Sequence, residues 1–346
     1  MTASEPLLRV RDLSVRFAGS IAAAVSHASL TLHPERTIAV VGESGSGKTV
    51  TALAAMGLLP REATCGGEVT LRRRSGERTD LVRCGERVMR SIRGAEIAMI
   101  LQEPMTSLNP VMSIGEQLEE SLVLHRRGMG RAARREACEQ ALADVGIARP
   151  GERLAQHPHE FSGGMRQRVM IAMALACEPS VLIADEPTTA LDAHVRGQIL
   201  DLIDSIRVSR RLGVLLITHD LGVVRRRADV ACVMFRGRVV EYGPASLVLE
   251  RPLHPYTAAL LACSPGISTR GTRLATIPTQ AATTFAEPVP AACEGLTPWW
   301  PGGGEASLVR AEAQRWVCVE GRHESSEPPD VDAARDASQG EPRCAC

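Results

Sequence analysis

The chain has 346 residues, a formal net charge of zero and 44% hydrophobic residues. This length permits one large domain or two modest ones, and the balanced charge is unlike the basic footprint of a nucleic-acid-binding protein. No apolar run approaches the roughly 18 to 20 residues that cross a bilayer, and the first residues do not have the pattern expected of a secretory leader. We therefore predict a cytosolic protein that reaches a membrane only through partners.

The N-terminal part of the sequence predicts a β layer followed by a strand, a loop and a helix. Residues 7–17 and 28–32 alternate apolar and polar side chains, which is typical of antiparallel strands. Residues 38–41 form a short apolar run that leads into a glycine-rich loop at residues 42–49. Residues 50–59 then have a helical pattern that Pro60 closes.

The middle of the chain alternates strands and helices, which predicts an α/β core with a mostly parallel sheet. A helical insertion at about residues 103–162, with helices at 114–125 and 131–145, is expected to split this core. The remaining core elements are expected as strands at 68–73, 96–101, 181–184 and 214–218, helices at 163–177 and 195–207, and a hairpin over 230–242 that turns at Arg236-Gly237.

The sequence changes character near residue 265. Residues 266–346 are rich in proline, glycine, serine and acids and have weak periodicity, which indicates partial disorder. We therefore predict one domain over residues 1–265 and an atypical C-terminal extension over 266–346.

The glycine-rich loop carries the chemistry of a phosphate cradle. It matches the pattern GxxxxGK[ST] in the residues Gly42, Glu43, Ser44, Gly45, Ser46, Gly47, Lys48 and Thr49. Glycines at these spacings let backbone N–H groups curl around phosphates, and the next helix adds its positive N-terminus. Lys48, the single lysine of the chain, is expected to bridge phosphate oxygens, and the Thr49 hydroxyl is expected to ligate Mg²⁺.

Two further motifs extend this site. The buried strand at 181–184 ends in the carboxylates Asp185 and Glu186, of which the first can hold Mg²⁺ and the second can orient and polarise an attacking water. Ser162, Gly163 and Gly164 begin a helix, with Ser162 as its N-cap. By itself, this start is more simply interpreted as an ordinary capped helix.

The set of motifs resembles the nucleotide-binding subunits of ABC transporters over about residues 7–265. The ordered motifs are the glycine-rich loop, Gln102 in Leu101-Gln102-Glu103-Pro104, Ser162-Gly163-Gly164, Asp185-Glu186, Ala190-Leu191-Asp192, and His219 in Ile217-Thr218-His219-Asp220. The resemblance implies the fold of a P-loop ATPase that uses ATP and Mg²⁺. It also implies a head-to-tail dimer in which Ser162, Gly163 and Gly164 contact the γ-phosphate held by the opposite subunit.

The same resemblance implies roles for single residues. Glu186, Gln102 and His219 would be catalytic: Gln102 would touch Mg²⁺ and water, and His219 would contact the γ-phosphate. Asp192 would communicate across the dimer. Phe17 matches the aromatic residue that stacks on adenine, although a core phenylalanine is an alternative for this position.

Three segments narrow the resemblance to the dipeptide, oligopeptide and nickel importer branch, which implies an ATPase that powers peptide uptake. They are residues 105–110, residues 163–174 and His254-Pro255-Tyr256-Thr257. An alternative is the same motor for nickel or another small solute, and a further one is a non-transport ABC ATPase that acts on ribosomes or DNA. The sequence does not identify the solute.

The resemblance also implies partners. They are a second ATPase subunit, which is either a copy of this chain or a paralogue, two membrane permease subunits and an extracytoplasmic solute-binding protein. We expect no nucleic acid partner. The chain would then sit peripherally on the cytoplasmic face of the cell membrane.

The extension departs from the pattern of this branch, whose members usually carry closely spaced cysteines there. Cys293 and Cys318 are 25 residues apart, and Cys318 and Cys344 are 26 apart, so we predict no iron–sulfur cluster. We hypothesise that the reading frame, or the C-terminal lineage, diverges around Cys293. Translation of the parent DNA in the other two frames tests this idea.

Overall fold

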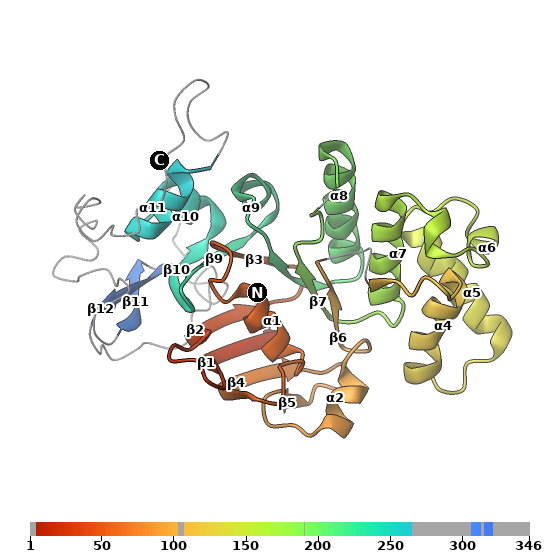
Figure 1. Cartoon of the computed structure of the whole chain (residues 1–346), viewed down its shortest axis with the longest axis horizontal. Coiled ribbons are helices and arrows are strands. Elements are labelled where there is room, and N and C mark those ends of the chain that lie inside the picture. The colour runs from red at the N-terminus through yellow and green to blue at the C-terminus, as the bar shows by residue number, and fades with distance from the viewer. Residues whose placement is uncertain (1–4, 103–106, 190, 265–305, 313–314, 321–346) are drawn as a thin grey trace, which may run out of the picture. The chain divides into compact units, whose positions relative to one another are not determined.

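The computed structural model describes residues 5–102, 107–189, 191–264, 306–312 and 315–320. The chain divides into two compact units (Figure 1). Unit 1 comprises Met1–Arg72, Asp80–Arg83 and Ile217–Cys346, and unit 2 comprises Arg73–Thr79 and Cys84–Leu216. The predicted domain boundary near residue 265 falls where the described residues stop, at residue 264. The predicted start of the insertion, residue 103, lies outside the described residues.

Unit 1 begins with the antiparallel layer that the alternating sequence predicts. Strands β1 (Leu8–Phe17), β2 (Val25–Leu32) and β4 (Ala63–Arg72) have the order β2-β1-β4. Both partners of β1 run antiparallel to it. Leu8, Val10, Leu13 and Val15 of β1 are all buried. Leu8 and Val10 are two positions apart, as are Leu13 and Val15, which is the spacing of one face of a strand. Between Val10 and Leu13 the spacing is three, and the strand pairing shifts its register there.

A second group of strands in unit 1 carries the glycine-rich loop. Its order is β11-β12-β10-β9-β3, with β3 at Thr37–Val41, β9 at Val230–Phe235 and β10 at Arg238–Pro244. Every residue of β3 and β9 is buried, and the two strands run parallel. Strands β9 and β10 form the predicted hairpin, and Arg236-Gly237 forms its turn.

Four helices accompany these strands in unit 1. They are α1 (Lys48–Ala55), α9 (Leu221–Arg227), α10 (Ala245–Glu250) and α11 (Pro255–Ala262). The helix predicted for residues 50–59 begins earlier and ends earlier. Gly57 adopts a left-handed conformation with φ +59°, which ends a helix before Pro60 can do so. The helices α9, α10 and α11 were not predicted.

Unit 2 contains the parallel strands that bear the two carboxylates. Its strands have the order β8-β7-β6, with β6 at Ile97–Ile100, β7 at Val181–Asp185 and β8 at Gly213–Ile217, of which only the last residue is assigned to unit 1. Strands β6 and β7 run parallel, with Ile100 beside Ala184. Helices α7 (Gly163–Leu175) and α8 (Ala193–Ser209) also belong to this unit. Within residues 84–216, the predicted mostly parallel core is thus confirmed.

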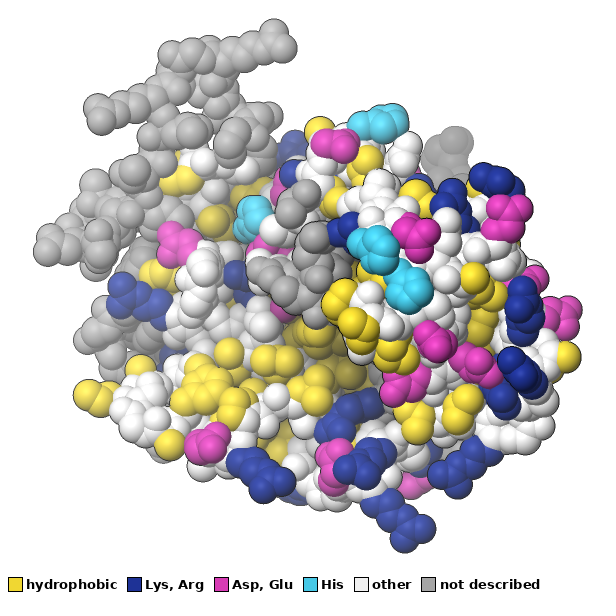
Figure 2. Space-filling model, turned by 45° about the vertical axis from the view of Figure 1, so that its right-hand side comes forward, with side chains coloured by type: hydrophobic (Ala, Val, Ile, Leu, Met, Phe, Trp, Pro, Cys, Tyr) yellow, Lys and Arg dark blue, Asp and Glu magenta, His cyan; other side chains and the backbone are white. Residues whose placement is uncertain are grey.

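The helical insertion of unit 2 has α4 (Ile114–His125), α5 (Arg131–Asp144), α6 (Pro150–Arg153) and a 3₁₀ turn at Pro158–Glu160. Figure 2 shows basic and acidic side chains interspersed on its surface, in keeping with ion pairs such as Arg134–Glu119 and Arg135–Glu139. Two short elements were missed by the sequence analysis: β5 (Arg78–Asp80) and α2 (Glu86–Ile92).

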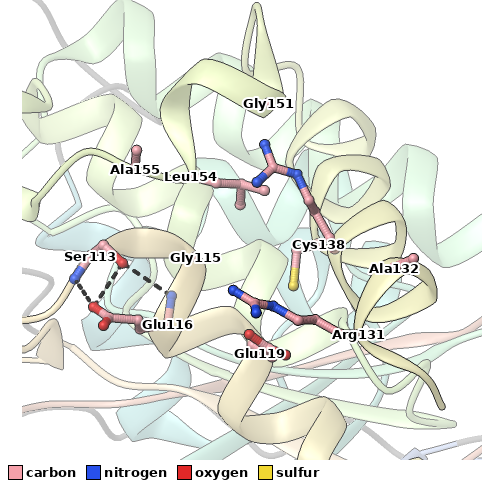
Figure 3. Close-up of a pocket in the computed structure, with 11 residues that line it drawn as sticks. Ser113, Gly115, Glu116, Glu119, Arg131, Ala132, Cys138, Gly151, Leu154 and Ala155 are labelled. Carbon is pink, nitrogen blue, oxygen red and sulfur yellow. Dashed lines mark hydrogen bonds between the residues drawn. The ribbon is translucent and has the colours of Figure 1, made fainter.

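The insertion contains a pocket of about 630 Å³ beside the start of α4 (Figure 3). The Ser113 amide and hydroxyl donate to Oε2 of Glu116 at 2.7 and 2.8 Å. The Glu116 amide donates in return to the Ser113 hydroxyl at 3.3 Å. This reciprocal pair is a capping box, which satisfies amides that the first turn of a helix leaves open.

A hairpin in the C-terminal extension is the largest element that the sequence analysis missed. Strands β11 (Ala306–Glu312) and β12 (Arg315–Glu320) are antiparallel, and β12 pairs with β10 (Figure 1). Arg315, Trp316, Val317 and Cys318 are buried. The origin of the extension after about Cys293 stays a hypothesis. Cys293 and Cys344 lie outside the described residues.

Among the described residues, we find no helix with both the length and the apolar character that a bilayer crossing needs.

We expect Ser113→Ala to lower the melting temperature by roughly 2–4 °C near neutral pH, because α4 loses its N-cap hydroxyl. The side-chain and backbone bonds from Ser113 hold the pKa of Glu116 below its ordinary value of 4.5. Their stabilisation is therefore complete above that value and declines as the pH falls through the lower pKa of the folded state. Measured by circular dichroism, the melting temperatures of the native chain and of Ser113→Ala should approach each other as the pH is lowered.

The control for this pH dependence is the Glu116→Gln background, in which residue 116 cannot ionise. There, Ser113→Ala should shift the melting temperature by an amount that does not change with pH. A pH-independent shift in the native background as well would contradict the assignment to the Glu116 carboxylate.

Candidate functional site

The glycine-rich loop of unit 1 encloses the ammonium of Lys48. This side chain is 7% exposed, and its Nζ donates to the carbonyl oxygens of Gly42 at 2.9 Å and Glu43 at 2.7 Å. Lys48 is the first residue of α1, and Thr49, the next residue, is exposed. Strand β3, the loop and α1 thus form the strand, loop and helix that the sequence predicts.

The glycines of this loop are required by close contacts and by backbone conformation. Gly42 has φ +149°, and a Cβ atom there would lie 2.1 Å from the carbonyl oxygen of Met234 in β9. Gly47 has φ +103°, and its Cβ would lie 2.7 Å from the carbonyl oxygen of Ala24. Gly45 has φ +79° with open space around it. A side chain is therefore excluded sterically at two of these positions and conformationally disfavoured at the third.

Two further predicted residues of the nucleotide site lie in unit 1. The backbone amide of Thr218 donates to the carbonyl of Val40 in β3 at 3.2 Å. This bond connects the residue before His219 to the strand that precedes the glycine-rich loop. His219 itself is exposed. Phe17 is half-buried at the end of β1, a position compatible with both interpretations of its role.

Unit 2 brings Gln102 and Glu186 together. Glu186 directly follows β7, and Gln102 lies two residues after the end of the adjacent parallel strand β6. The side-chain amide of Gln102 donates to Oε2 of Glu186 at 3.3 Å. Asp185 ends β7 and is 3% exposed, whereas Gln102 is exposed. The side chains of Gln102 and Glu186 are thus in contact, and their catalytic roles stay predictions.

The backbone at Glu186 is strained, and a residue that sequence reasoning missed holds its side chain. Glu186 has φ +46°, which is uncommon for a residue with a Cβ and frequent at functional sites. The Thr189 hydroxyl donates to the same Oε2 of Glu186 at 2.8 Å. The spacing of three residues after the carboxylate was a usable signal, because a Thr at that distance reaches back across a turn.

The helix start at Ser162 is confirmed as a capped helix. Ser162 is the N-cap of α7 and accepts from the Met165 amide at 3.4 Å, and Ser162 and Gly163 are exposed. Gly164 has an additional packing role, because a Cβ there would lie 2.7 Å from Cγ1 of Val195 in α8.

Asp192 has a local structural role in unit 2. It is the N-cap of α8, and its Oδ1 accepts from the Val195 amide at 2.9 Å. The neighbouring Ala190 lies outside the described residues. The role of Asp192 across a dimer stays a prediction.

Together, these features define a P-loop nucleotide-binding protein. The pattern of the ABC transporter family matches residues 25–189, and that of the oligopeptide/dipeptide transporter C-terminal region matches residues 240–293. The dipeptide transport ATP-binding protein DppD of Bacillus subtilis is 48% identical over 275 residues, which cover 79% of this chain and 81% of that protein. The chain therefore belongs to the ABC transporter ATP-binding protein family.

Other similar proteins agree with this assignment. The oligopeptide transport ATP-binding protein OppD of Salmonella typhimurium is 46% identical, with 79% of this chain and 80% of that protein covered. A solved dimeric ATP-binding cassette bound to ADP and Pi has a TM-score of 0.59 and 24% identity, covering 69% of this chain and 98% of that chain. At this identity, the structural likeness supports the P-loop ATPase fold.

We expect Gly164→Ala to destabilise the protein by about 1–3 kcal/mol, because the new methyl group overlaps the stiff, β-branched side chain of Val195. Gly163→Ala is the matched control, since the nearest atom to its Cβ is Cδ2 of Leu191 at 3.9 Å. Urea unfolding of both variants measures the difference. Adding Val195→Ala to Gly164→Ala should relieve the overlap and restore stability. Equal stability of Gly164→Ala and Gly163→Ala would contradict the predicted overlap.

Proposed function

We propose that this chain is the ATP-hydrolysing subunit of an importer for peptides. The observation that carries the proposal is the match, over 79% of the chain, to ATP-binding proteins named for dipeptide and oligopeptide transport. A glutathione import protein of Salmonella choleraesuis is also 49% identical, although the chain covers only 42% of that longer protein. These names favour short peptides as the solute class over nickel.

The residues of unit 1 fit a nucleoside triphosphate. Side chains are excluded at Gly42 and Gly47, which leaves the backbone free to approach phosphates, and Lys48 already points its ammonium at the loop. The Lys48 charge and the N-terminus of α1 would bind the β- and γ-phosphates. Phe17 and His219 are proposed to contact the adenine and the γ-phosphate.

The residues of unit 2 supply the acids that hydrolysis requires. Asp185 and Gln102, with Thr49 of the loop, would hold Mg²⁺, which neutralises charge on the phosphates when it is bound. Glu186 would orient the attacking water and accept its proton. The hydrogen bonds from Gln102 and Thr189 to Glu186 hold its carboxylate in a defined orientation.

The assembly is proposed from the same family membership. A second ATPase subunit, either a copy or a paralogue, would place its Ser162, Gly163 and Gly164 over the nucleotide of this chain, and Asp192 would couple the two sites. Membrane permease subunits and a solute-binding protein would complete the importer. In this arrangement, the chain would lie at the cytoplasmic face of the membrane.

We expect Lys48→Arg to weaken ATP binding and to reduce hydrolysis by at least about 100-fold. The carbonyls of Gly42 and Glu43 enclose a compact ammonium at 2.9 and 2.7 Å, and a planar guanidinium cannot replace it without moving the loop. Nucleotide titration and phosphate release measure the two effects, with circular dichroism as the check of folding. Wild-type affinity and rate would show that the loop accepts the larger cation.

We expect Glu186→Gln to reduce hydrolysis by roughly 10²–10⁴-fold while ATP binding persists, since glutamine keeps the contacts to Thr189 and Gln102 but cannot accept a proton. Glu178→Gln is a matched control, because Glu178 is another acid with positive φ in unit 2. Hydrolysis near the wild-type rate in Glu186→Gln would remove Glu186 from its role.

The solute class is tested in vesicles that contain the chain with its permease and solute-binding partners. Uptake of a labelled dipeptide should require ATP and should stop with Glu186→Gln. ATP-driven uptake of nickel with no uptake of any peptide would overturn the proposed solute but not the ATPase.

A further inference from the structure

The peptide between Gly42 and Glu43 is held from both sides. Its carbonyl oxygen, on Gly42, accepts from Nζ of Lys48 at 2.9 Å. Its N–H group, on Glu43, donates to the hydroxyl oxygen of Tyr256 at 3.1 Å. Because the C=O and N–H of a trans peptide point in opposite directions, these two contacts fix the orientation of the peptide plane. Tyr256 thus acts on the same peptide as the phosphate-binding lysine.

Tyr256 is buried and closely packed within unit 1. It belongs to α11, is completely buried, and stacks on Phe235 of β9 with ring centroids 4.1 Å apart. Burial raises the pKa of the Tyr256 hydroxyl to about 12, so this group stays neutral and available as an acceptor near neutral pH. Phe235 directly follows Met234, whose carbonyl oxygen restricts position 42 to glycine.

The start of α11 is fixed by the carboxylate of Glu241 in β10. Its two oxygens accept from the amides of Leu253 and His254, each at 3.0 Å. Nδ1 of His254 in turn accepts from the amide of Tyr256 at 3.1 Å. Glu241 and His254 are completely buried. A buried carboxylate therefore orders the two residues that precede the helix of Tyr256.

A buried carboxylate of this kind needs a counter-charge, and the C-terminal hairpin supplies it. Nη2 of Arg315, in β12, donates to Oε1 of Glu241 at 2.5 Å and to the Arg251 carbonyl at 2.6 Å. Both side chains of the ion pair are fully buried. Removal of one partner would leave an uncompensated charge in the interior, which is strongly unfavourable.

We propose that α11 and the β11–β12 hairpin brace the phosphate-binding loop, with Tyr256 as a positioning residue for ATP. The hairpin neutralises Glu241, Glu241 orders the start of α11, and Tyr256 holds the Gly42–Glu43 peptide so that Lys48 is correctly placed. The inference rests on the proposed binding of ATP to this loop. It gives the C-terminal extension a role in nucleotide affinity.

The first test is Tyr256→Phe, which removes the acceptor for the Glu43 amide and keeps the ring that stacks on Phe235. The loop should then spend only part of its time in the binding conformation, so ATP should bind roughly fivefold to tenfold more weakly with kcat little changed. Tyr242→Phe is the matched control, because its hydroxyl contacts Thr31 instead. Nucleotide titration and the dependence of hydrolysis on ATP concentration measure these effects.

The second test concerns the hairpin. Glu241→Gln combined with Arg315→Met removes both buried charges and should weaken ATP binding to a similar extent. Adding Tyr256→Phe should then produce little further loss, because both changes act through one contact. Arg310→Met is the control, since Arg310 is an exposed arginine of the same hairpin.

Two outcomes would overturn the inference. Equal ATP affinity of Tyr256→Phe and Tyr242→Phe, even with a lowered melting temperature, would show that Tyr256 is only structural. Unchanged ATP affinity in the Glu241 and Arg315 double variant would show that the hairpin does not support the loop. Failure of the wild-type chain to bind ATP would instead refute the proposed function, so the two failures are distinguishable.

Discussion

The ammonium of Lys48 is almost excluded from solvent, and the protein satisfies it with the carbonyls of Gly42 and Glu43. A buried charge must be hydrogen-bonded, and two carbonyls can turn toward one side chain only if the chain curls tightly. That curl requires positive φ at Gly42, Gly45 and Gly47. The tight curl of this loop is thus linked to the enclosure of one cation.

The pairing of Gln102 with Glu186 in unit 2 obeys a different constraint. Strands β6 and β7 run parallel in register, so the residues that follow them emerge side by side. Gln102 and Glu186 are 84 residues apart in sequence, yet they share a hydrogen bond for this reason. The left-handed backbone at Glu186 then directs its carboxylate toward Thr189 and Gln102.

Sequence reasoning succeeded where a local pattern decides the structure. The helix at 114–125 was predicted with its observed bounds, because its apolar residues recur at helical spacing. The hairpin turn at Arg236-Gly237 was also predicted, since glycine accepts positive φ there. Strand β12 was missed, because four consecutive buried residues, one of them Arg315, have no period of two.

By itself, the sequence determined the glycine-rich loop, the adjacent carboxylates Asp185 and Glu186, and the family, because these depend on residue types at short spacings. Only the tertiary structure decided which distant residues contact the loop and the buried charges around it. Tyr256 lies 213 positions from Glu43, and Arg315 lies 74 from Glu241, yet each pair is joined by a hydrogen bond. Partnerships of this kind depend on which buried groups the folded chain brings together, since each must find a partner once water is excluded.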